Sequence, residues 1–396
     1  MNNNFIFSRT PHIIFGQKKI NELTNQIKKF GKNILFFTGA TSLKKSGILD
    51  KLLNIFNDEE INYTHITINK EPSPDLIDEI VKENKNKKIN VIVSIGGGSV
   101  IDAGKAVSAM LLQNDSVYNY LEQIGNKNHN GKKIPFIAIP TTAGTGSEAT
   151  KNSVLSKVGE YGFKKSIRHD NFIPDIAIID GELFINCPSE IAAVCGMDAF
   201  SQLLESYIST KSFFFTAVLC LPAMKNIILN IEKICSSSAS IEEWEKMALA
   251  ALTSGITLAN AGLCVIHGFA ASIGGLYEIP HGVICGSLLP PSVELIIKKI
   301  IKTDKNNFAI KKFIDIAKLF NSQENKSNEY YLDSLINNLY QLTNKLKIPA
   351  LTKYNLKAND FKKIAEITEI KNNPIKLSQE ELYEILLLNS EKINNN

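Results

Sequence analysis

Short apolar runs alternate with amphipathic segments through the first 180 residues of this chain of 396 residues. Four runs are rich in Ile, Val and Phe, and each is closed by Gly, Pro or Asp; they span 32–40, 89–98, 134–142 and 174–180. Runs of this kind are typical of parallel strands that are buried on both faces. The segments between them, such as 75–87 and 99–113, have the pattern of surface helices. The alternation therefore predicts a doubly wound α/β domain.

The strand pattern stops after Asp180, and the remaining segments have the length and periodicity of helices. We therefore expect two domains, an α/β domain over residues 1–185 and an all-helical domain over residues 186–396. Residues 247–277 contain no Asp, Glu, Lys or Arg, which raises the question of a membrane span. Gly, Ala, Ser, Thr and Asn are too frequent there, and Gly274-Gly275 would break a span. We interpret this stretch as helices buried inside the protein.

Composition argues against several classes of protein. The net charge of +4 comes from scattered lysines, so we expect no nucleic-acid partner. Arg9 and Pro11 interrupt the apolar residues at the start, which is unlike a signal peptide, and we expect no membrane partner. The cysteines show no CxxC spacing, which favours reduced, mostly buried thiols in a cytoplasmic protein. They are Cys187, Cys195, Cys220, Cys235, Cys264 and Cys285.

A glycine-rich turn follows the second apolar run and leads directly into a helix-like segment. It contains Gly96, Gly97, Gly98 and Ser99. Glycines let the backbone approach a pyrophosphate closely, and a helix N-terminus offers free N–H groups and a favourable dipole. The turn lacks the GxGxxG spacing of a standard dinucleotide loop, and a tight turn without a ligand is the alternative.

A second glycine-rich segment, PTTAGTGSE at 140–148, follows the third run. Thr141, Thr142 and Thr145 place hydroxyl groups beside flexible backbone. Two such loops at the carboxyl ends of strands in one sheet are where an open α/β fold binds a dinucleotide. A polar surface loop without a ligand is the alternative here.

Four residues of the second half could hold a divalent metal. Asp198 and Gln202 are four residues apart on one helix face, and His267 and His281 bracket part of the uncharged stretch. A carboxylate and neutral imidazoles suit a catalytic divalent ion, and three protein ligands leave a position free for a substrate oxygen. Taken singly, each has an ordinary explanation: a group that stabilises a helix dipole, a core histidine, or a capping residue.

The order and spacing of these motifs over about Phe5 to Pro291 resemble the iron-containing alcohol dehydrogenase family. The resemblance implies the dehydroquinate synthase-like fold, an α/β nucleotide-binding domain followed by an all-helical metal domain. It also implies hydride transfer between NAD(H) or NADP(H) and a small alcohol or aldehyde. By residue, it places Gly96, Gly97, Gly98, Ser99 and Asp102 at the pyrophosphate, Thr141, Thr142 and Thr145 on the second cofactor loop, and Lys164 against the cofactor. Asp198, His267 and His281 match metal ligands and form the expected catalytic centre.

Two positions depart from the family pattern. Gln202 occupies the place of a ligand histidine, and Ala271 occupies the place of a further histidine near the nicotinamide. An amide oxygen is a weaker ligand than imidazole for a soft or borderline metal. We therefore expect one divalent ion, Fe or Zn, bound weakly, with Gln202 as an auxiliary ligand. The retained Asp-His-His set resembles the zinc set of the glycerol dehydrogenase branch.

Cofactor preference depends on the end of the first apolar run. NAD-preferring relatives often have an aspartate at the position of Gly39, where a carboxylate would repel a 2′-phosphate. Its absence, together with Ser42, Lys44 and Lys45 nearby, favours NADP over NAD slightly. Solvated lysines and loose selectivity are the alternative.

We therefore predict an NAD(P)-dependent oxidoreductase that interconverts a small alcohol and its aldehyde or ketone by metal-assisted hydride transfer, as a homodimer. Two alternatives stay open. One is a metal-independent reductase of the maleylacetate reductase type, which would explain the loss of a ligand. The other is a non-catalytic nucleotide-binding relative.

Overall fold

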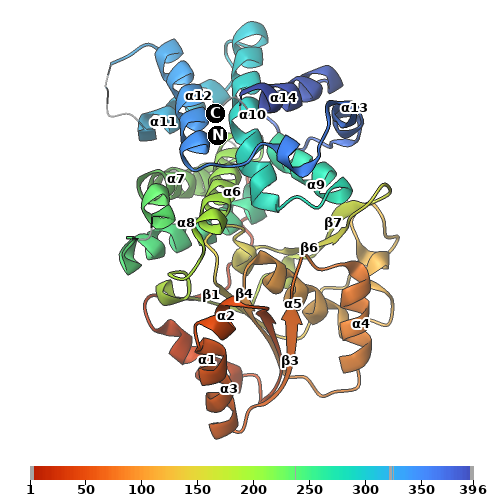
Figure 1. Cartoon of the computed structure of the whole chain (residues 1–396). Helices are drawn as coiled ribbons and strands as arrows, with labels where there is room; N and C mark the ends of the chain where they lie inside the picture. Colours follow the sequence, from red (N-terminus) through yellow and green to blue (C-terminus); the bar gives the residue numbers. More distant parts are fainter. Residues whose placement is uncertain (1–3, 237, 321–322, 324, 393–396) are drawn as a thin grey trace.

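The computed structural model describes residues 4–236, 238–320, 323 and 325–392. Figure 1 shows a parallel sheet with its helices in the first part of the chain and a body of packed helices in the second part. The last strand of the sheet ends at Ile179, and the first long helix begins at Ser189. The division at residue 185 falls between them and stays a prediction.

The sheet has six parallel strands in the order β1-β8-β5-β4-β2-β3. The four strands that the sequence predicts are present and are almost completely buried, as a sheet covered on both faces requires. The outer strands β1 and β3 were not predicted, because their residues are only partly buried and alternate with polar ones. The bounds are β1 His12–Phe15, β2 Asn33–Gly39, β3 Asn62–Ile68, β4 Val91–Gly96, β5 Phe136–Pro140 and β8 Ile176–Ile179.

Helices cover both faces of the sheet. On one face α1 (Leu23–Lys28) and α3 (Ile48–Asp58) pack in a hydrophobic core that continues into the helical part. On the other face α4 (Pro74–Asn84) and α5 (Gly98–Met110) pack in a second core. Because one core runs through both parts of the chain, the helical part packs firmly against the α/β part.

The carboxyl ends of three adjacent strands lie at one edge of the sheet. Thr38 of β2 pairs with Ile95 of β4, and Gly96 of β4 pairs with Pro140 of β5. The two glycine-rich loops leave from this edge, as does the short helix α2 (Ser42–Lys45). This is the edge at which open α/β sheets bind their ligands.

An antiparallel hairpin, β6 (Asn152–Lys157) and β7 (Phe163–Arg168), connects the two parts of the molecule (Figure 1). It packs on α9 (Val265–Leu276), where a Cβ on Gly275 would lie 2.8 Å from Phe163 Cα and one on Gly274 would lie 2.9 Å from Lys164 Cδ. Gly274-Gly275, which the sequence suggests would break a span, do not end the helix, since α9 continues to Leu276. The two glycines instead let the hairpin approach the helix closely.

The second part is helical throughout the residues that the structure describes. Its helices are α6 Ser189–Ile208, α7 Phe214–Cys235, α8 Ile241–Ala261, α9, α10 His281–Thr303, α11 Ala309–Phe320, α12 Asn328–Lys345, α13 Ala358–Ile367 and α14 Gln379–Lys392. The uncharged stretch forms most of α8 and all of α9, two helices bent by 98° relative to each other and largely buried. Among the described residues, only α7 is by itself long and apolar enough to cross a membrane, and 44% of that window is buried.

The N-terminal segment crosses to the helical part. The rings of Phe5 and Phe213 stack with centroids 4.3 Å apart, and Ser8 N–H donates to Asn260 Oδ1 at 2.6 Å. The first described residues therefore pack on the helices, although the sequence groups them with the α/β domain.

Candidate active site

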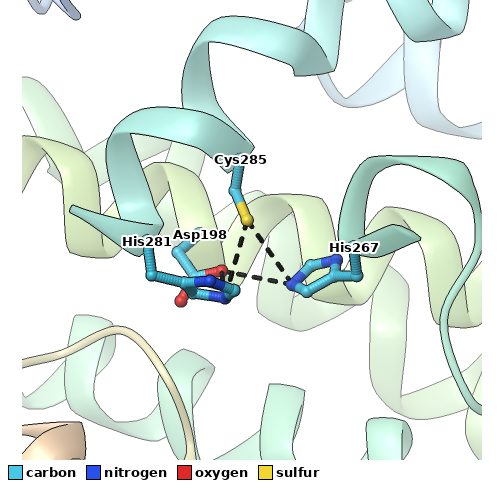
Figure 2. Close-up of side chains that lie close together, drawn as sticks. All are labelled: Asp198, His267, His281 and Cys285. Carbon is cyan, nitrogen blue, oxygen red and sulfur yellow. Dashed lines mark hydrogen bonds and ion pairs between the residues drawn. The ribbon is translucent and has the colours of Figure 1, made fainter. Parts of the chain in front are cut away.

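Four side chains from three helices point toward one another in the helical part (Figure 2). They are Asp198 of α6, His267 of α9, and His281 and Cys285 of α10, and each contributes one potential ligand atom within 4.8 Å of the others. Asp198 Oδ1 lies 3.3 Å from His267 Nε2 and 3.6 Å from His281 Nε2. Cys285 Sγ lies 3.7 Å from each of the same two nitrogens. We refer to these four residues as the metal cluster.

Helix geometry accounts for this convergence. Asp198 lies in the middle of α6, so it is not the dipole-stabilising group of a helix start. His281 is the first residue of α10, directly after Pro280, and Cys285 lies one turn further on the same face. The chain ends α9 at Leu276 and turns back into α10, which brings His267 opposite His281. His267 and His281 therefore lie on different helices and still face each other.

A second carboxylate orients His267. Glu205, on α6 and almost fully buried, has Oε2 2.7 Å from His267 Nδ1 and accepts a hydrogen bond from the Ile266 N–H at 2.6 Å. Donation from Nδ1 to Glu205 leaves the Nε2 lone pair of His267 facing the cluster. This carboxylate–histidine pairing is the usual support of a metal-ligating imidazole.

Gln202 contacts Asp198. Its Nε2 donates to Asp198 Oδ2 at 3.3 Å, while its Oε1 accepts from Ser254 Oγ at 2.7 Å. In this orientation Gln202 supports Asp198 and presents no oxygen to the cluster. The role of Gln202 as an auxiliary metal ligand stays a prediction, and in this orientation its amide oxygen accepts from Ser254 on α8.

The electrostatics of the cluster suit a cation. Burial opposes ionisation of Asp198, but His281 and His267 outweigh it and lower the pKa of this carboxyl below its usual value. Burial lowers the pKa of His281 to about 4, which keeps this imidazole neutral. Burial opposes protonation of His267 too, yet the neighbouring Cys285, Asp198 and Glu205 raise its pKa well above the usual value.

The buried Asp198 Oδ1 makes no hydrogen bond. An unsatisfied buried acceptor costs about 1–3 kcal/mol, more when it is charged. The oxygen faces two imidazole nitrogens that carry lone pairs in the neutral form, so a proton or a metal cation between them would remove the penalty. The residues therefore fit a divalent metal.

The structure brings the two glycine-rich loops into contact. Gly97 caps α5, and a Cβ added there would lie 3.3 Å from Thr142 Oγ1. A Cβ on Gly98 would lie 2.7 Å from Thr145 Cγ2. Gly97, Gly98 and Ser99 are partly exposed at the N-terminus of α5, where free backbone N–H groups can meet a phosphate.

Other predicted cofactor residues lie around these loops. Gly39 ends β2 at the same sheet edge, and Ser42 begins α2. Thr141 is buried. Asp102 lies inside α5, where its Oδ2 accepts from the Val154 N–H at 3.2 Å, so it ties the helix to β6.

Lys164 of β7 pairs with Glu71 and acts electrostatically on the metal cluster. Its Nζ lies 2.5 Å from Glu71 Oε1, and its charge contributes to lowering the pKa of His281.

The second glycine-rich loop packs directly on α8, where a Cβ on Gly255 would lie 2.1 Å from Gly146 O. By contrast, a hollow of about 290 Å³ beside Lys133 and Asp175 lies at the amino ends of the strands, the edge that such sheets do not use.

Comparison with known proteins agrees with this arrangement. The profile of "Iron-containing alcohol dehydrogenase" matches residues 10–181, and that of "Fe-containing alcohol dehydrogenase family, C-terminal" matches residues 192–389. The chain is 28% identical over 393 residues to the NADPH-dependent butanol dehydrogenase of Clostridium saccharobutylicum, covering 96% of each chain. It is 32% identical over 266 residues to the 1,3-propanediol dehydrogenase of Klebsiella pneumoniae, covering 66% of this chain and 67% of that one.

A solved structure of 1,3-propanediol oxidoreductase has the same fold, with a TM-score of 0.87 and 26% identity over 98% of this chain and 100% of the other. The fold and the site define an NAD(P)-dependent oxidoreductase that acts on alcohols and aldehydes. The chain belongs to the iron-containing alcohol dehydrogenase family, whose members use NAD(P) and a divalent metal. The predicted family, fold and enzyme class are confirmed.

Sequence reasoning missed two residues of the site. Glu205 is close to the face of Asp198 along α6, but nothing in the sequence pairs it with His267. Cys285 was interpreted as one of several buried thiols. Its position four residues after His281 on a helix is a signal that could have identified it.

Glu205→Gln is expected to weaken metal binding by about 10–100-fold, the usual cost of losing the partner of a metal-ligating histidine. The amide keeps the size of the carboxylate but not its charge, so His267 loses its anionic acceptor. Titration of the metal-free protein with Zn²⁺ measures the effect. Glu190→Gln, an exposed position on the same helix, is the control and should bind as the parent protein does. Equal affinity in both variants would contradict the role of Glu205.

Proposed function

We propose that this chain interconverts a small primary alcohol and its aldehyde with a preference for NADP(H), using one Fe²⁺ or Zn²⁺ ion held by Asp198, His267 and His281. The observation that carries the proposal is the buried Asp198 Oδ1, which has no hydrogen bond and faces two imidazole nitrogens. The metal-independent reductase stays the alternative, because a proton on His267 Nε2 would also satisfy this oxygen.

Some residues of the site would bind the cofactor, and others position the metal ligands. The loops at Gly97 and Thr142 would hold the pyrophosphate and direct the nicotinamide toward the cluster. Glu205 and Gln202 orient His267 and Asp198. A divalent ion in the cluster would supply Lewis-acid polarisation of the substrate oxygen. Since Ala271 offers no proton-transfer group, we propose that a water molecule or a ribose hydroxyl carries the proton.

The proposed preference for NADP is inferred from the residues at and after the end of β2. Gly39 provides no carboxylate against a 2′-phosphate, and Ser42, Lys44 and Lys45 of α2 are exposed beside it. The names of the relatives include an NADPH-dependent butanol dehydrogenase and an NAD-dependent methanol dehydrogenase, so family membership alone does not decide the cofactor.

A panel of small aldehydes with NADPH and NADH, before and after chelator treatment, tests the proposed function. We expect NADPH-dependent reduction that is lost with the metal and restored by Fe²⁺ or Zn²⁺. Full activity in the chelated protein would favour the metal-independent reductase. Tight NADPH binding without turnover of any aldehyde would favour a non-catalytic relative.

Gly39→Asp is expected to raise the KM for NADPH by about tenfold or more and to leave the KM for NADH nearly unchanged. A carboxylate there repels the 2′-phosphate, and like charges placed together cost several kcal/mol when they are poorly solvated. Gly39→Asn has nearly the same shape without the charge and is the matched control. A similar effect of both substitutions would show that the size of the side chain at this position, not its charge, determines the affinity for NADPH.

We also propose a cytoplasmic homodimer. Exposed apolar side chains gather along α7, where Phe214, Phe215, Val218 and Leu229 are all more than half exposed. Surfaces of this kind commonly mark a protein contact. Light scattering of the purified protein measures the oligomeric state.

A further inference from the structure

We propose that the thiolate of Cys285 is a fourth protein ligand of the metal ion and replaces the imidazole that is missing at Gln202. The proposal rests on the proposed function, which places the ion at Asp198, His267 and His281, and it changes the donor set to Asp-His-His-Cys. In the family pattern the fourth donor lies at the position of Gln202 on α6, one turn after Asp198. In this chain it would lie on α10, one turn after His281.

Four of the six separations between the donor atoms match those around a single tetrahedral ion, and all six are within 4.8 Å. Bond lengths of about 2.0 Å to oxygen, 2.05 Å to nitrogen and 2.3 Å to sulfur imply separations of about 3.3 Å for oxygen and nitrogen and about 3.6 Å for sulfur and nitrogen. The observed separations are 3.3 and 3.6 Å from Asp198 Oδ1 to the two Nε2 atoms, and 3.7 Å from Cys285 Sγ to each of them. One ion can therefore lie within reach of all four atoms, and a substrate oxygen would then enter as a fifth ligand.

Cys285 differs from an ordinary buried thiol of the same chain. The Sγ of Cys264 donates to the backbone oxygens of Glu205 and Asn372, which are not metal ligands. Cys285 Sγ instead contacts the two imidazole nitrogens of the cluster, both potential metal ligands (Figure 2). The side chain is fully buried, so no water competes for the sulfur.

Charge favours the thiolate as well. Binding converts the Cys285 thiol to a thiolate, with its proton released to solvent and a sulfur lone pair donated to the ion. The two negative donors, Asp198 and Cys285, offset a divalent charge, and the two imidazoles are neutral. The neutral Gln202 in place of the thiolate would leave one positive charge buried. A set of sulfur, nitrogen and oxygen donors in tetrahedral array favours Zn²⁺ over harder ions.

Cobalt substitution tests the assignment on the full chain. Metal-free protein is titrated with Co²⁺, and we expect a near-ultraviolet sulfur-to-cobalt charge-transfer band that saturates at one ion per chain. Cys285→Ser should abolish the band, keep the weaker visible cobalt bands, and raise the dissociation constant for Co²⁺ by about tenfold or more, since even loss of a supporting partner costs this much. Cys264→Ser keeps a hydroxyl for the same backbone acceptors and should keep the band.

A double variant tests whether Cys285 takes the place of the imidazole that is missing at Gln202. Gln202→His in the Cys285→Ser background should restore tight Co²⁺ binding without restoring the charge-transfer band. One bound Co²⁺ with no such band in the parent protein would overturn the proposal, and this measurement requires no variant to fold. That result would leave the proposed function intact if turnover still requires metal. Absence of any Co²⁺ binding, with chelator-resistant turnover, would overturn both.

Discussion

His267→Ala and His281→Ala are each expected to reduce turnover by about 10³-fold, and the double variant is expected to lose little more. Lewis-acid stabilisation is worth several kcal/mol, and each 1.4 kcal/mol corresponds to about a factor of ten in rate. The two imidazoles face the same Asp198 Oδ1 at 3.3 and 3.6 Å. If they hold one ion, removal of either disables the same centre, so the two losses cannot add.

Turnover per folded molecule, with metal content measured on the same samples, tests this expectation. His129→Ala is a suitable control, since that histidine packs against Phe172 in the α/β part and should affect stability alone. If His267 and His281 were only core residues, their substitutions would lower the free energy of unfolding additively while turnover persisted. Clearly additive effects on rate would contradict a single metal ion shared by the two histidines.

Gly97→Val is expected to raise the dissociation constant for the cofactor by about 10–100-fold. Backbone hydrogen bonds to the pyrophosphate are worth about 1–3 kcal/mol together, and a branched side chain at the N-terminus of α5 would keep the phosphate at a distance. A Cβ at Gly97 meets only the side chain of Thr142, with Oγ1 at 3.3 Å and Cγ2 at 3.6 Å, so the protein should still fold. Gly98 would be a poorer test, because a Cβ there lies 2.7 Å from Thr145.

Fluorescence titration with NADPH measures the change, and Co²⁺ binding by the same variant checks that the helical part is intact. Gly97→Ala should give a smaller effect in the same direction. Unchanged cofactor affinity in a folded Gly97→Val protein would show that the pyrophosphate does not bind at this loop.

Local patterns in the sequence determined much of the fold. A strand buried on both faces, such as Val91–Gly96, and a mostly apolar helix, such as α9, each carry their own signature, because burial acts on neighbouring residues of one element. The glycine-rich loops could be placed at one sheet edge because parallel strands share the direction of their carboxyl ends. The exposed edge strand β3 lacked that signature and was missed.

The metal cluster depended on tertiary structure. Only the packing of α6 against α9 and α10 brings Cys285 to Asp198 and His267, and no local period relates residues so far apart. The same packing turns the Gln202 amide oxygen toward Ser254 and pairs Glu205 with His267. The sequence by itself determined which elements form and where nucleotide loops follow strands, since both depend on short-range spacing. Which atoms share the metal cluster was decided by how helices far apart in the chain pack together.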